Sequence, residues 1–475
     1  MPLNTNPGPH YAAEPPSPGT RLSIWSVVAV LAALQFGAGL IQGFYLPLLP
    51  DIGAHLHVAA GPLNWFFSVG LLGAAVSIPI LSALGDRYGH RRLLNVAVWA
   101  TAAGSALICL APSFLVVLLG CGIQAPILVW LALEIALVRD KLAGARATTG
   151  IGLLASSLSA GYLLGSLVAG SIQSVLGDIR LTLAIPVVLT VLCGVVTMFL
   201  VPESTTRTNR PIDWIGALSV SLGLAAILLT MLQAGRTGWA APRIWIGITA
   251  GSVVFVAWAW WELRTDHPMV NLRLFASTAI LPAMLLTLCY GVVVYGETVP
   301  LVTFLSADPK KLGYGFGFSS SAISLSIAAI LVALVVGSSL SGPISNKIGV
   351  RSVLSIGIGV AGVSYVSMVF FHSSVWMILG AGAALNFGCG LLIAGLPIYI
   401  SGVVPRDNVA TATGTYSTLK VLGASVATAS FGTLLSSFTS ATSGAPTMSG
   451  YIAVWFTCAA PAAAALVMLA LVWRA

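Results

Sequence analysis

The amino-acid sequence predicts an all-α polytopic membrane protein with fourteen transmembrane helices, arranged as two pseudo-symmetric six-helix bundles plus an inserted helix pair. Three observations support this fold class. Hydrophobic residues fill 57% of the 475 positions and charged residues only 7%, so the apolar surface exceeds what a soluble core can bury. Apolar runs long enough to cross a bilayer recur along the whole chain. A short charged motif also returns 260 residues later.

Each apolar run has the length of a membrane-spanning helix. A helix rises 1.5 Å per residue, so about 20 residues cross the roughly 30 Å hydrocarbon core. The runs lack the alternation of apolar and polar residues that marks a membrane β-barrel, and helices satisfy their own backbone hydrogen bonds in lipid. The predicted spans are residues 22–50, 63–84, 93–111, 114–137, 148–172, 181–201, 214–233, 244–262, 278–305, 320–343, 352–371, 375–400, 411–437 and 450–473.

The predicted domain limits follow from these spans. Residues 1–20 contain six prolines, which cannot build a helix, so we expect a disordered cytoplasmic tail. The apolar segment that follows is too long for the core of a signal peptide and is therefore assigned as the first span. The other units are the first six-helix bundle, the inserted helix pair (spans 7 and 8) and the second six-helix bundle, at residues 21–201, 202–276 and 277–475.

The distribution of positive charge predicts the orientation. The formal charge of +8 could indicate an acidic partner such as nucleic acid, but the positive residues lie in alternate loops. Of the 21 Lys and Arg residues, fifteen fall on the side of the N-terminus, five fall on the other side, and Lys420 lies inside a span. Cytoplasmic loops of membrane proteins carry such an excess. We therefore expect both termini in the cytoplasm, the lipid bilayer as partner, and no nucleic acid.

The charged motif at residues 85–92 lies between the second and third spans and packs three arginines and one aspartate together. It has a second copy between the corresponding spans of the second bundle. Internal repeats of bundled helices are typical of secondary transporters, in which one half rocks against the other. The first copy contains Asp86, Arg87, Gly89 and Arg91, and the second has Asn346, Lys347, Gly349 and Arg351 at the same places.

Together these motifs resemble the major facilitator superfamily, specifically its 14-helix drug:proton antiporter branch, over nearly the whole chain. Residues 82–92 are similar to the family's signature between helices 2 and 3. Residues 202–275 resemble the inserted helix pair of that branch, and residues 422–425 with Gly432 also fit. Four glycines of the fifth span keep the spacing of the antiporter glycine motif, namely Gly152, Gly161, Gly165 and Gly170.

Two spans depart from the family pattern. In the fourth span Cys121 stands where the family carries an arginine, and Ala125 stands where a glycine follows Gln124. The first span, which holds an acidic residue in many relatives, offers only Gln35 and Gln42. Both departures remove groups that the family associates with proton coupling.

The resemblance implies that the charged motif is a conformational hinge that stabilises the outward-facing state. A carboxylate at the membrane boundary can accept hydrogen bonds from guanidinium groups or face the positive end of a helix. The alternative is a solvated charge cluster that only sets orientation. The predicted hinge residues are Asp86, Arg87, Gly89, Arg91, Arg92, Asp140, Asn346, Lys347, Gly349 and Arg351.

Two glutamates are the candidates for proton coupling. Glu297 lies in the outer part of the ninth span between Gly296 and Pro300, and burying its ionised form is expensive, so it can be protonated in one state of a cycle. Its alternative is a side chain that reaches the outer interface. Glu134 lies near the cytoplasmic end of the fourth span. It either receives protons from the inner vestibule or anchors the structure by pairing with Arg139 or a loop.

Polar and aromatic residues within the spans are candidates for a substrate cavity. Lys420 lies about nine residues, or roughly 13 Å, into the thirteenth span; it faces the cavity or an acid, or extends to the interface. If it is buried, its positive charge would favour anionic or zwitterionic substrates or would neutralise Glu297 or Glu134 in one state. Aromatic side chains accept flat apolar solutes, although each can equally pack between helices. The cavity candidates are Gln35, Gln42, Gln124, Trp130, Tyr290, Tyr295, Asn386, Tyr416 and Lys420. The four glycines named above are expected to allow close helix packing, with or without a function in gating.

The remaining sequence features argue against other classes of protein. All six cysteines lie in predicted spans, so no disulfide is expected. His55 and His57 lack a third metal ligand, and neither a phosphate-binding loop for ATP nor a nucleophile elbow occurs. We expect no cofactor and no enzymatic activity, but export of an amphiphilic organic compound against protons by a monomer in a bacterial inner membrane. The alternatives are an uncoupled facilitator, a proton-coupled importer, and a membrane enzyme or receptor that does not transport.

Overall fold

The computed structural model describes residues 24–58, 65–204, 213–237, 241–265, 280–318, 320–405, 408–438 and 446–472, and every secondary-structure element within them is a helix. Eleven of these helices are long and apolar enough to cross a membrane. Helices also occupy the seventh, ninth and thirteenth predicted spans, so the total of fourteen crossings stays a prediction. The predicted tail at residues 1–20 lies outside the described residues.

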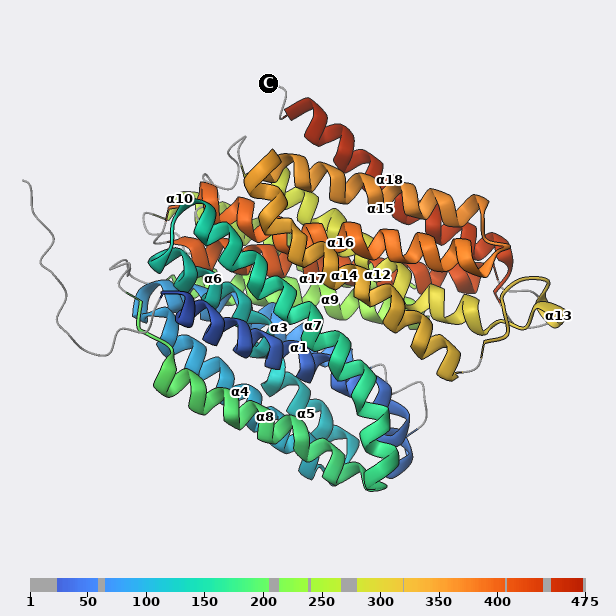
Figure 1. The fold of residues 1–475 in the computed structure, drawn as a ribbon, viewed down its shortest axis with the longest axis horizontal. Helices are drawn as coiled ribbons and strands as arrows, with labels where there is room; N and C mark the ends of the chain where they lie inside the picture. The colour runs from blue at the N-terminus through green and yellow to red at the C-terminus, as the bar shows by residue number, and fades with distance from the viewer. Residues whose placement is uncertain are drawn as a thin grey trace, which may run out of the picture.

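The helices form two groups that follow each other in sequence (Figure 1). The first group consists of α1 (Ile24–His55), α3 (Trp65–Tyr88), α4 (His90–Leu110), α5 (Phe114–Gln124), the 3-10 turn η1 (Ala125–Val129), α6 (Trp130–Lys141), α7 (Gly144–Leu176) and α8 (Ile179–Leu200). The second group consists of α12 (Leu281–Ser306), α13 (Pro309–Leu312), α14 (Ser320–Ile348), α15 (Val350–Phe370), α16 (Val375–Val403), α17 (Val409–Ser437) and α18 (Met448–Val472).

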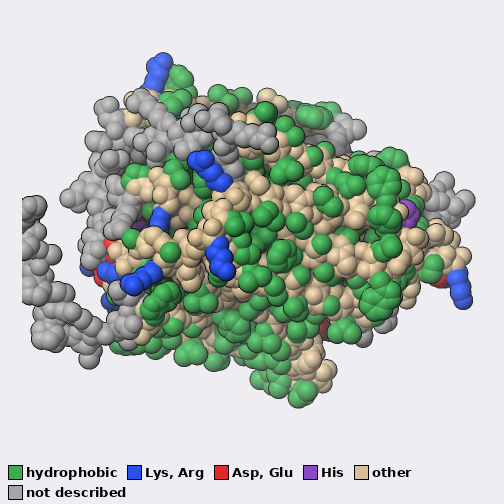
Figure 2. Space-filling model, turned by 45° about the horizontal axis from the view of Figure 1, so that its top comes forward, with side chains coloured by type: hydrophobic (Ala, Val, Ile, Leu, Met, Phe, Trp, Pro, Cys, Tyr) green, Lys and Arg blue, Asp and Glu red, His purple; other side chains and the backbone are tan. Residues whose placement is uncertain are grey.

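Each group surrounds its own hydrophobic core. Apart from three residues of α16 and α17, the first core is built from α1 and α3 to α8, whereas the second is built from α12 to α18 and the loops between them. The outer face of the molecule is also apolar: in Figure 2, hydrophobic and uncharged atoms cover most of the visible surface, and only a few Lys and Arg side chains interrupt it. An apolar exterior together with an apolar interior is what lipid, rather than water, requires of a folded chain.

The remaining two helices, α9 (Trp214–Thr237) and α10 (Pro242–Arg264), pack against each other and against the seam between the groups. Val220 of α9 and Trp258 of α10 form a small cluster with Val421 of α17, and Leu71 and Leu72 of α3 pack against it. Because α3 belongs to the first group and α17 to the second, this pair covers the line where the two groups meet.

The two copies of the charged motif adopt the same backbone geometry. The sequence places both in loops, but α3 continues through Tyr88 and α4 begins at His90, so only Gly89 lies outside a helix. In the second copy Gly349 alone separates α14 from α15. Both glycines have positive φ, 108° and 87°, a conformation that favours glycine because other residues carry a Cβ. The repeat is therefore structural as well as sequential.

Both glycine links lie at the same end of the molecule, which we call the hinge end. The link at Gly89 is close to the start of α17, because Asp86 contacts Thr411. The link at Gly349 is close to the start of α7, because Asn346 contacts Thr149. The start of α7 follows the end of α6, and Arg139 of α6 contacts the end of α16, just before α17 begins. Since the helices alternate in direction, α1 begins and α18 ends at this end too.

Glycines allow α1 and α7 to approach each other closely in the first group. A Cβ on Gly161 would lie 2.0 Å from the carbonyl oxygen of Phe36, and one on Gly165 would lie 2.2 Å from that of Leu40. Gly152 instead faces Gly342 of α14, across the two groups, at 3.3 Å. Gly170 was expected to act in the same way, but nothing lies within 4 Å of its added Cβ. It therefore makes no close helix contact.

This difference between two glycines of one helix gives a matched test. Replacing Gly161 with leucine forces α1 and α7 apart along backbone atoms that cannot move aside, so we expect the yield of folded protein to fall at least fivefold. Gly170→Leu is expected to keep the yield within a factor of two. Size-exclusion chromatography of the detergent-purified variants measures both. Equal yields would mean that the approach of α1 to α7 does not depend on Gly161.

Candidate functional site

Asp86, at the end of α3, is bound to the first turn of α17 in the other group. Its Oδ2 accepts hydrogen bonds from the backbone N–H of Thr411 at 3.0 Å and from the Thr411 hydroxyl at 2.5 Å. Its Oδ1 lies 3.0 Å from Nε2 of His90. The first N–H groups of a helix lack partners within the helix and carry a partial positive charge. The Asp86 carboxylate supplies both a hydrogen-bond acceptor and the opposite charge, and it is 4% exposed.

Three further contacts join the two groups near the same end. The Arg139 guanidinium of α6 donates to the carbonyl oxygen of Ser401 in α16 at 2.6 and 3.0 Å. The Asn346 amide of α14 donates to the Thr149 hydroxyl of α7 at 3.2 Å. The Thr413 hydroxyl lies 3.3 Å from the carbonyl oxygen of Ala132 in α6. The hinge end is therefore closed by polar contacts that all cross the seam.

The other hinge residues do not bind Asp86. Arg91 donates to the carbonyl oxygen of Met198 in α8, and Arg92 lies 3.6 Å from Glu203. Arg87 lies over the ring of Tyr88, and Asp140 pairs with Lys141 at 3.1 Å. Of the two ways in which a carboxylate could be satisfied here, the structure uses the helix N-terminus and not guanidinium groups. Lys347 and Arg351, the basic residues of the second copy, are exposed.

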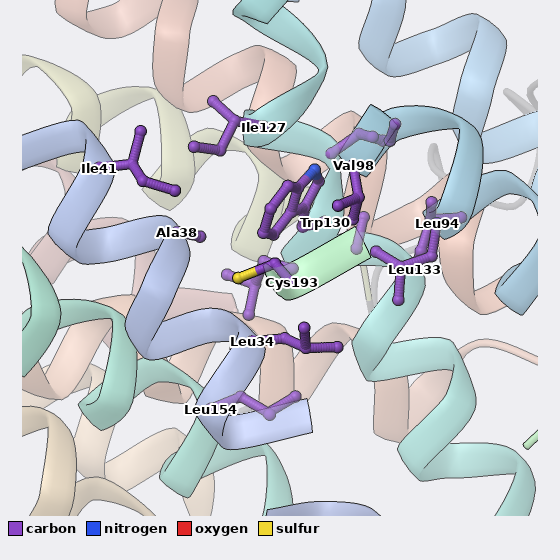
Figure 3. Close-up of a cluster of buried hydrophobic side chains, with 14 of the residues drawn as sticks. Leu34, Ala38, Ile41, Leu94, Val98, Ile127, Trp130, Leu133, Leu154 and Cys193 are labelled. Atoms are coloured by element: carbon purple, nitrogen blue, oxygen red, sulfur yellow. The ribbon is translucent and has the colours of Figure 1, made fainter. Parts of the chain in front are cut away.

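Glu134 lies in the interior of the first group. It is fully buried, and neither carboxylate oxygen has a hydrogen-bond partner among the described residues. It follows Trp130 by four residues on α6, so the two side chains share one face of the helix. In Figure 3 the Trp130 indole lies among Ala38 and Ile41 of α1 and Val98 of α4, with Cys193 of α8 beside it.

In this position Glu134 does not pair with Arg139, the structural anchor that the sequence left open. The Arg139 side chain reaches Ser401 in the second group, and a helix turns about 100° per residue, so the side chains at 134 and 139 diverge. Trp130 is also placed differently from expectation, because it fills the core of the first group and does not line a passage between the groups. The sequence alone does not show whether an aromatic residue in a span faces the passage between the two groups or the core of its own group.

Gln124 was predicted to line a cavity but is bound within the first group. Its amide nitrogen donates to the Tyr45 hydroxyl at 3.0 Å and to the Ser105 hydroxyl at 2.7 Å. Both partners belong to the same group, on α1 and α4. On α1, Gln35 is 2% exposed and its Oε1 has no hydrogen-bond partner among the described residues. Gln42, seven residues later, lies on the same face and is partly exposed.

Lys420 and Tyr416 lie together on α17. Lys420 comes eleven residues after Val409, the first residue of this 29-residue helix, which corresponds to about 16 Å along the helix axis. Its Nζ lies 5.7 Å from the centre of the Tyr416 ring, close enough for a cation–π contact. The Tyr416 hydroxyl is buried and has no hydrogen-bond partner among the described residues.

Two of the remaining cavity candidates are bound or buried within the second group. Tyr290 is 1% exposed in the core of the second group, and Asn386 donates to the carbonyl oxygen of Gly382 at 3.1 Å within its own helix. Glu297 and Tyr295 belong to α12, but their side chains lie outside the described residues. All six cysteines are free, and the described residues contain no group of three metal-binding side chains.

The sequence reading missed several residues of the closed end. His90 could have been found, because it follows Asp86 by four residues on what becomes almost continuous helix. Thr411, Ser401 and Thr149 gave no signal, since a threonine or serine in an apolar span usually bonds to its own helix. Thr411 is 325 residues from its partner Asp86, and only the arrangement of the two groups brings them together.

Two helical halves around a seam, closed at one end by contacts that can be broken, define a multi-pass membrane transport protein and not an enzyme. The profile of the Major Facilitator Superfamily matches residues 31–308 and 284–475, which together span nearly the whole described chain. The protein belongs to the major facilitator superfamily.

Several relatives have names that refer to resistance or export. The chain is 26% identical over 425 residues to multidrug resistance protein Stp of Mycobacterium tuberculosis, covering 87% of this chain and 77% of the relative. It is 24% identical to the probable actinorhodin transporter of Streptomyces coelicolor, covering 90% and 75%. It is 25% identical to the methyl viologen resistance protein SmvA of Salmonella typhimurium, covering 82% and 80%.

Solved structures show the same fold. The human organic anion transporter MFSD10 superimposes with a TM-score of 0.68 at 16% identity, covering 94% of this chain and all of that one. The transporter FucP in its outward conformation superimposes with a TM-score of 0.64 at 12% identity, covering 94% and 98%. At such identities the likeness concerns the fold alone.

Proposed function

We propose that the protein is a secondary active transporter that exports an amphiphilic organic compound from the cytoplasm by proton antiport. The observation that carries the proposal is the closed hinge end, where Asp86 binds the first turn of α17 across the seam. The names of the relatives, which refer to multidrug resistance and to an antibiotic, support an efflux transporter. The 14-helix branch, the domain limits at residues 201 and 276 and a monomeric state belong to the same proposal.

The excess of Lys and Arg assigns the hinge end to the cytoplasm, with both termini there. The closed hinge end then corresponds to the outward-facing or occluded state. Before the next substrate molecule can enter the passage from the cytoplasm, the contacts of Asp86, Arg139 and Asn346 across the seam must break. Substrate and proton need not share a site, because each has only to bind one of the two states more tightly. We place the protein in a bacterial inner membrane.

Two glutamates would carry the proton between the two sides. Glu297 lies nine residues, or about 14 Å, before the end of α12 that is remote from the hinge. Glu134 lies seven residues, or about 10 Å, before the hinge end of α6. An ionised carboxylate without a hydrogen bond is expensive to bury, so Glu134 is expected to hold a proton while the hinge end is closed. Glu297 would take the proton from outside and Glu134 would release it inside.

A second candidate, an uncoupled facilitator or a proton-coupled importer, is favoured by the neutral first span. The first span offers only Gln35 and Gln42 where the family resemblance leads us to expect an acid, and Cys121 stands where the family carries an arginine. Proteoliposomes with an imposed pH gradient separate the candidates. Antiport predicts that substrate accumulates in the compartment that protons leave, import predicts the opposite direction, and a facilitator does not respond to the gradient.

The Glu297→Gln variant belongs in the same assay. It is expected to keep the fold and to lose accumulation driven by the pH gradient at least tenfold, because glutamine cannot release a proton. Lys311→Gln, a change in the exposed short helix α13 at the remote end, is the matched control and should not alter accumulation. Accumulation by the Glu297 variant at the wild-type rate would remove Glu297 from the proposed cycle.

A further inference from the structure

The charge inside the bundle points to the chemical class of the substrate. Lys420 lies in the middle of α17, half-buried, and no described carboxylate pairs with its ammonium group. A charge at this depth is costly, so such residues face the interior of a bundle or a water-filled space and mark the path of a substrate or ion. The alternative is a lysine that faces lipid and extends its stem to the interface.

The neighbours of α17 argue against a lipid-facing lysine. This helix packs against α3, α6, α9, α12, α16 and α18, so other helices surround it. Lys420 follows Thr413 by seven residues, or two turns, and therefore lies on the same face. The Thr413 hydroxyl lies 3.3 Å from the Ala132 carbonyl oxygen of the first group. Lys420 therefore faces the seam between the two groups, further from the closed hinge end.

A second observation at the same place indicates a ligand. The Tyr416 hydroxyl, one turn from Lys420, is buried with no hydrogen-bond partner in the part of the chain that the structure describes. A buried polar group without a partner costs free energy. The Tyr416 ring packs in the core of the second group, and a bound anion would supply an acceptor to its hydroxyl and a counter-charge to the ammonium group.

The other substrate-cavity candidates that the structure describes carry no negative charge. Gln35 and Gln42 of α1, Tyr290 of α12 and Asn386 of α16 are neutral. The carboxylate of Glu134 is fully buried in the first group instead. Lys420 is therefore the one charged side chain among the described cavity candidates, and its positive charge attracts an anion and repels a cation.

We propose that Lys420 and Tyr416 form an anion-binding subsite and that the exported compound is an amphiphile with a carboxylate, sulfonate or comparable acidic group. This inference rests on the proposed export function for its direction of transport, but binding can be measured without transport. Two dyes with the same xanthene skeleton serve as probes: fluorescein is an anion and rhodamine 6G is a cation. A permanent dication such as methyl viologen is a second cationic probe.

The test is equilibrium binding to the full chain purified in a non-ionic detergent, measured by fluorescence anisotropy, with displacement of fluorescein for the non-fluorescent probe. Wild-type protein is expected to bind fluorescein at least tenfold more tightly than rhodamine 6G. Lys420→Gln should weaken fluorescein binding at least tenfold, about 1.4 kcal/mol, and leave rhodamine binding unchanged or stronger. Lys420→Arg should retain fluorescein binding, and Lys311→Gln is the matched control.

The outcomes separate the two proposals. If the protein binds fluorescein through Lys420 but exports nothing in vesicles, the subsite holds and the export function fails. If wild-type protein prefers the cations, or if Lys420→Gln leaves fluorescein binding intact, the subsite is overturned whether or not export occurs. Tighter cation binding in wild-type protein that is lost in Glu297→Gln would assign the charge preference to that glutamate and would also overturn the subsite.

Discussion

Replacing Asp86 with alanine is expected to reduce export at least a hundredfold while the protein still folds. The carboxylate accepts two hydrogen bonds from Thr411 and faces the positive end of α17. Its removal leaves two buried donors of α17 without partners. This cost arises only in the state in which the hinge end is closed. Hydrogen bonds to charged groups contribute about 1.5–3 kcal/mol each, so losing two of them shifts the balance of the two states toward the cytoplasm-open one by two or more powers of ten.

The prediction is checked by vesicle transport together with labelling of a cysteine introduced at Thr149, which contacts Asn346 across the seam. Labelling from the cytoplasmic side should rise as export falls. Asp178→Ala is the matched control, because Asp178 also caps a helix N-terminus, at Arg180, but within one group and away from the seam. An Asp86 variant with wild-type export would contradict the proposed function of this contact, since the closed state would then not depend on it.

The second large effect is expected for Glu134→Gln. Glutamine matches the shape of a protonated glutamate and can remain in the core beside Trp130, so the protein should fold and bind substrate as before. It cannot release a proton, so accumulation against a substrate gradient should fall at least a hundredfold, whereas exchange of substrate down its own gradient should continue. This separation between coupled and uncoupled transport distinguishes a proton carrier from a packing residue.

The measurement uses proteoliposomes with and without an imposed pH gradient. Cys193→Ala is the control, because Cys193 of α8 lies close to Glu134 of α6 and its change tests packing in the same core. If both forms of transport decline together in Glu134→Gln, the residue supports the structure and does not carry the proton. In that case Glu297 alone would couple proton movement to substrate transport.

The fold could be predicted from the sequence because lipid imposes strong constraints on it. Long apolar runs, positive charge on one side and a repeated motif depend only on local sequence, and the helices, the two groups and the paired glycine links agree with them. The limits of the helices differ from the predicted ones at the two charged motifs. Both charged motifs lie in the last turn of one helix and the first turn of the next, since only Gly89 and Gly349 leave the helical conformation.

The site was harder to predict because its contacts join distant parts of the chain. Asp86 was identified from its charge, but its partner Thr411 is an unremarkable threonine whose position depends on how α3 meets α17. Trp130 and Gln124 were assigned to a passage from residue type alone, and both belong to the core of the first group. A span that is apolar on every side gives no periodic pattern to tell its central face from its packed face.

The central claim is that the two groups move against each other and that the contacts at the hinge end must break in every cycle. A disulfide across the seam tests it most directly. In protein whose six native cysteines have been replaced, Thr149→Cys combined with Asn346→Cys places two thiols where side chains now meet at 3.2 Å. Oxidation should join α7 to α14 and stop export, and reduction should restore it. Export that continues at the full rate with the disulfide intact would contradict the account.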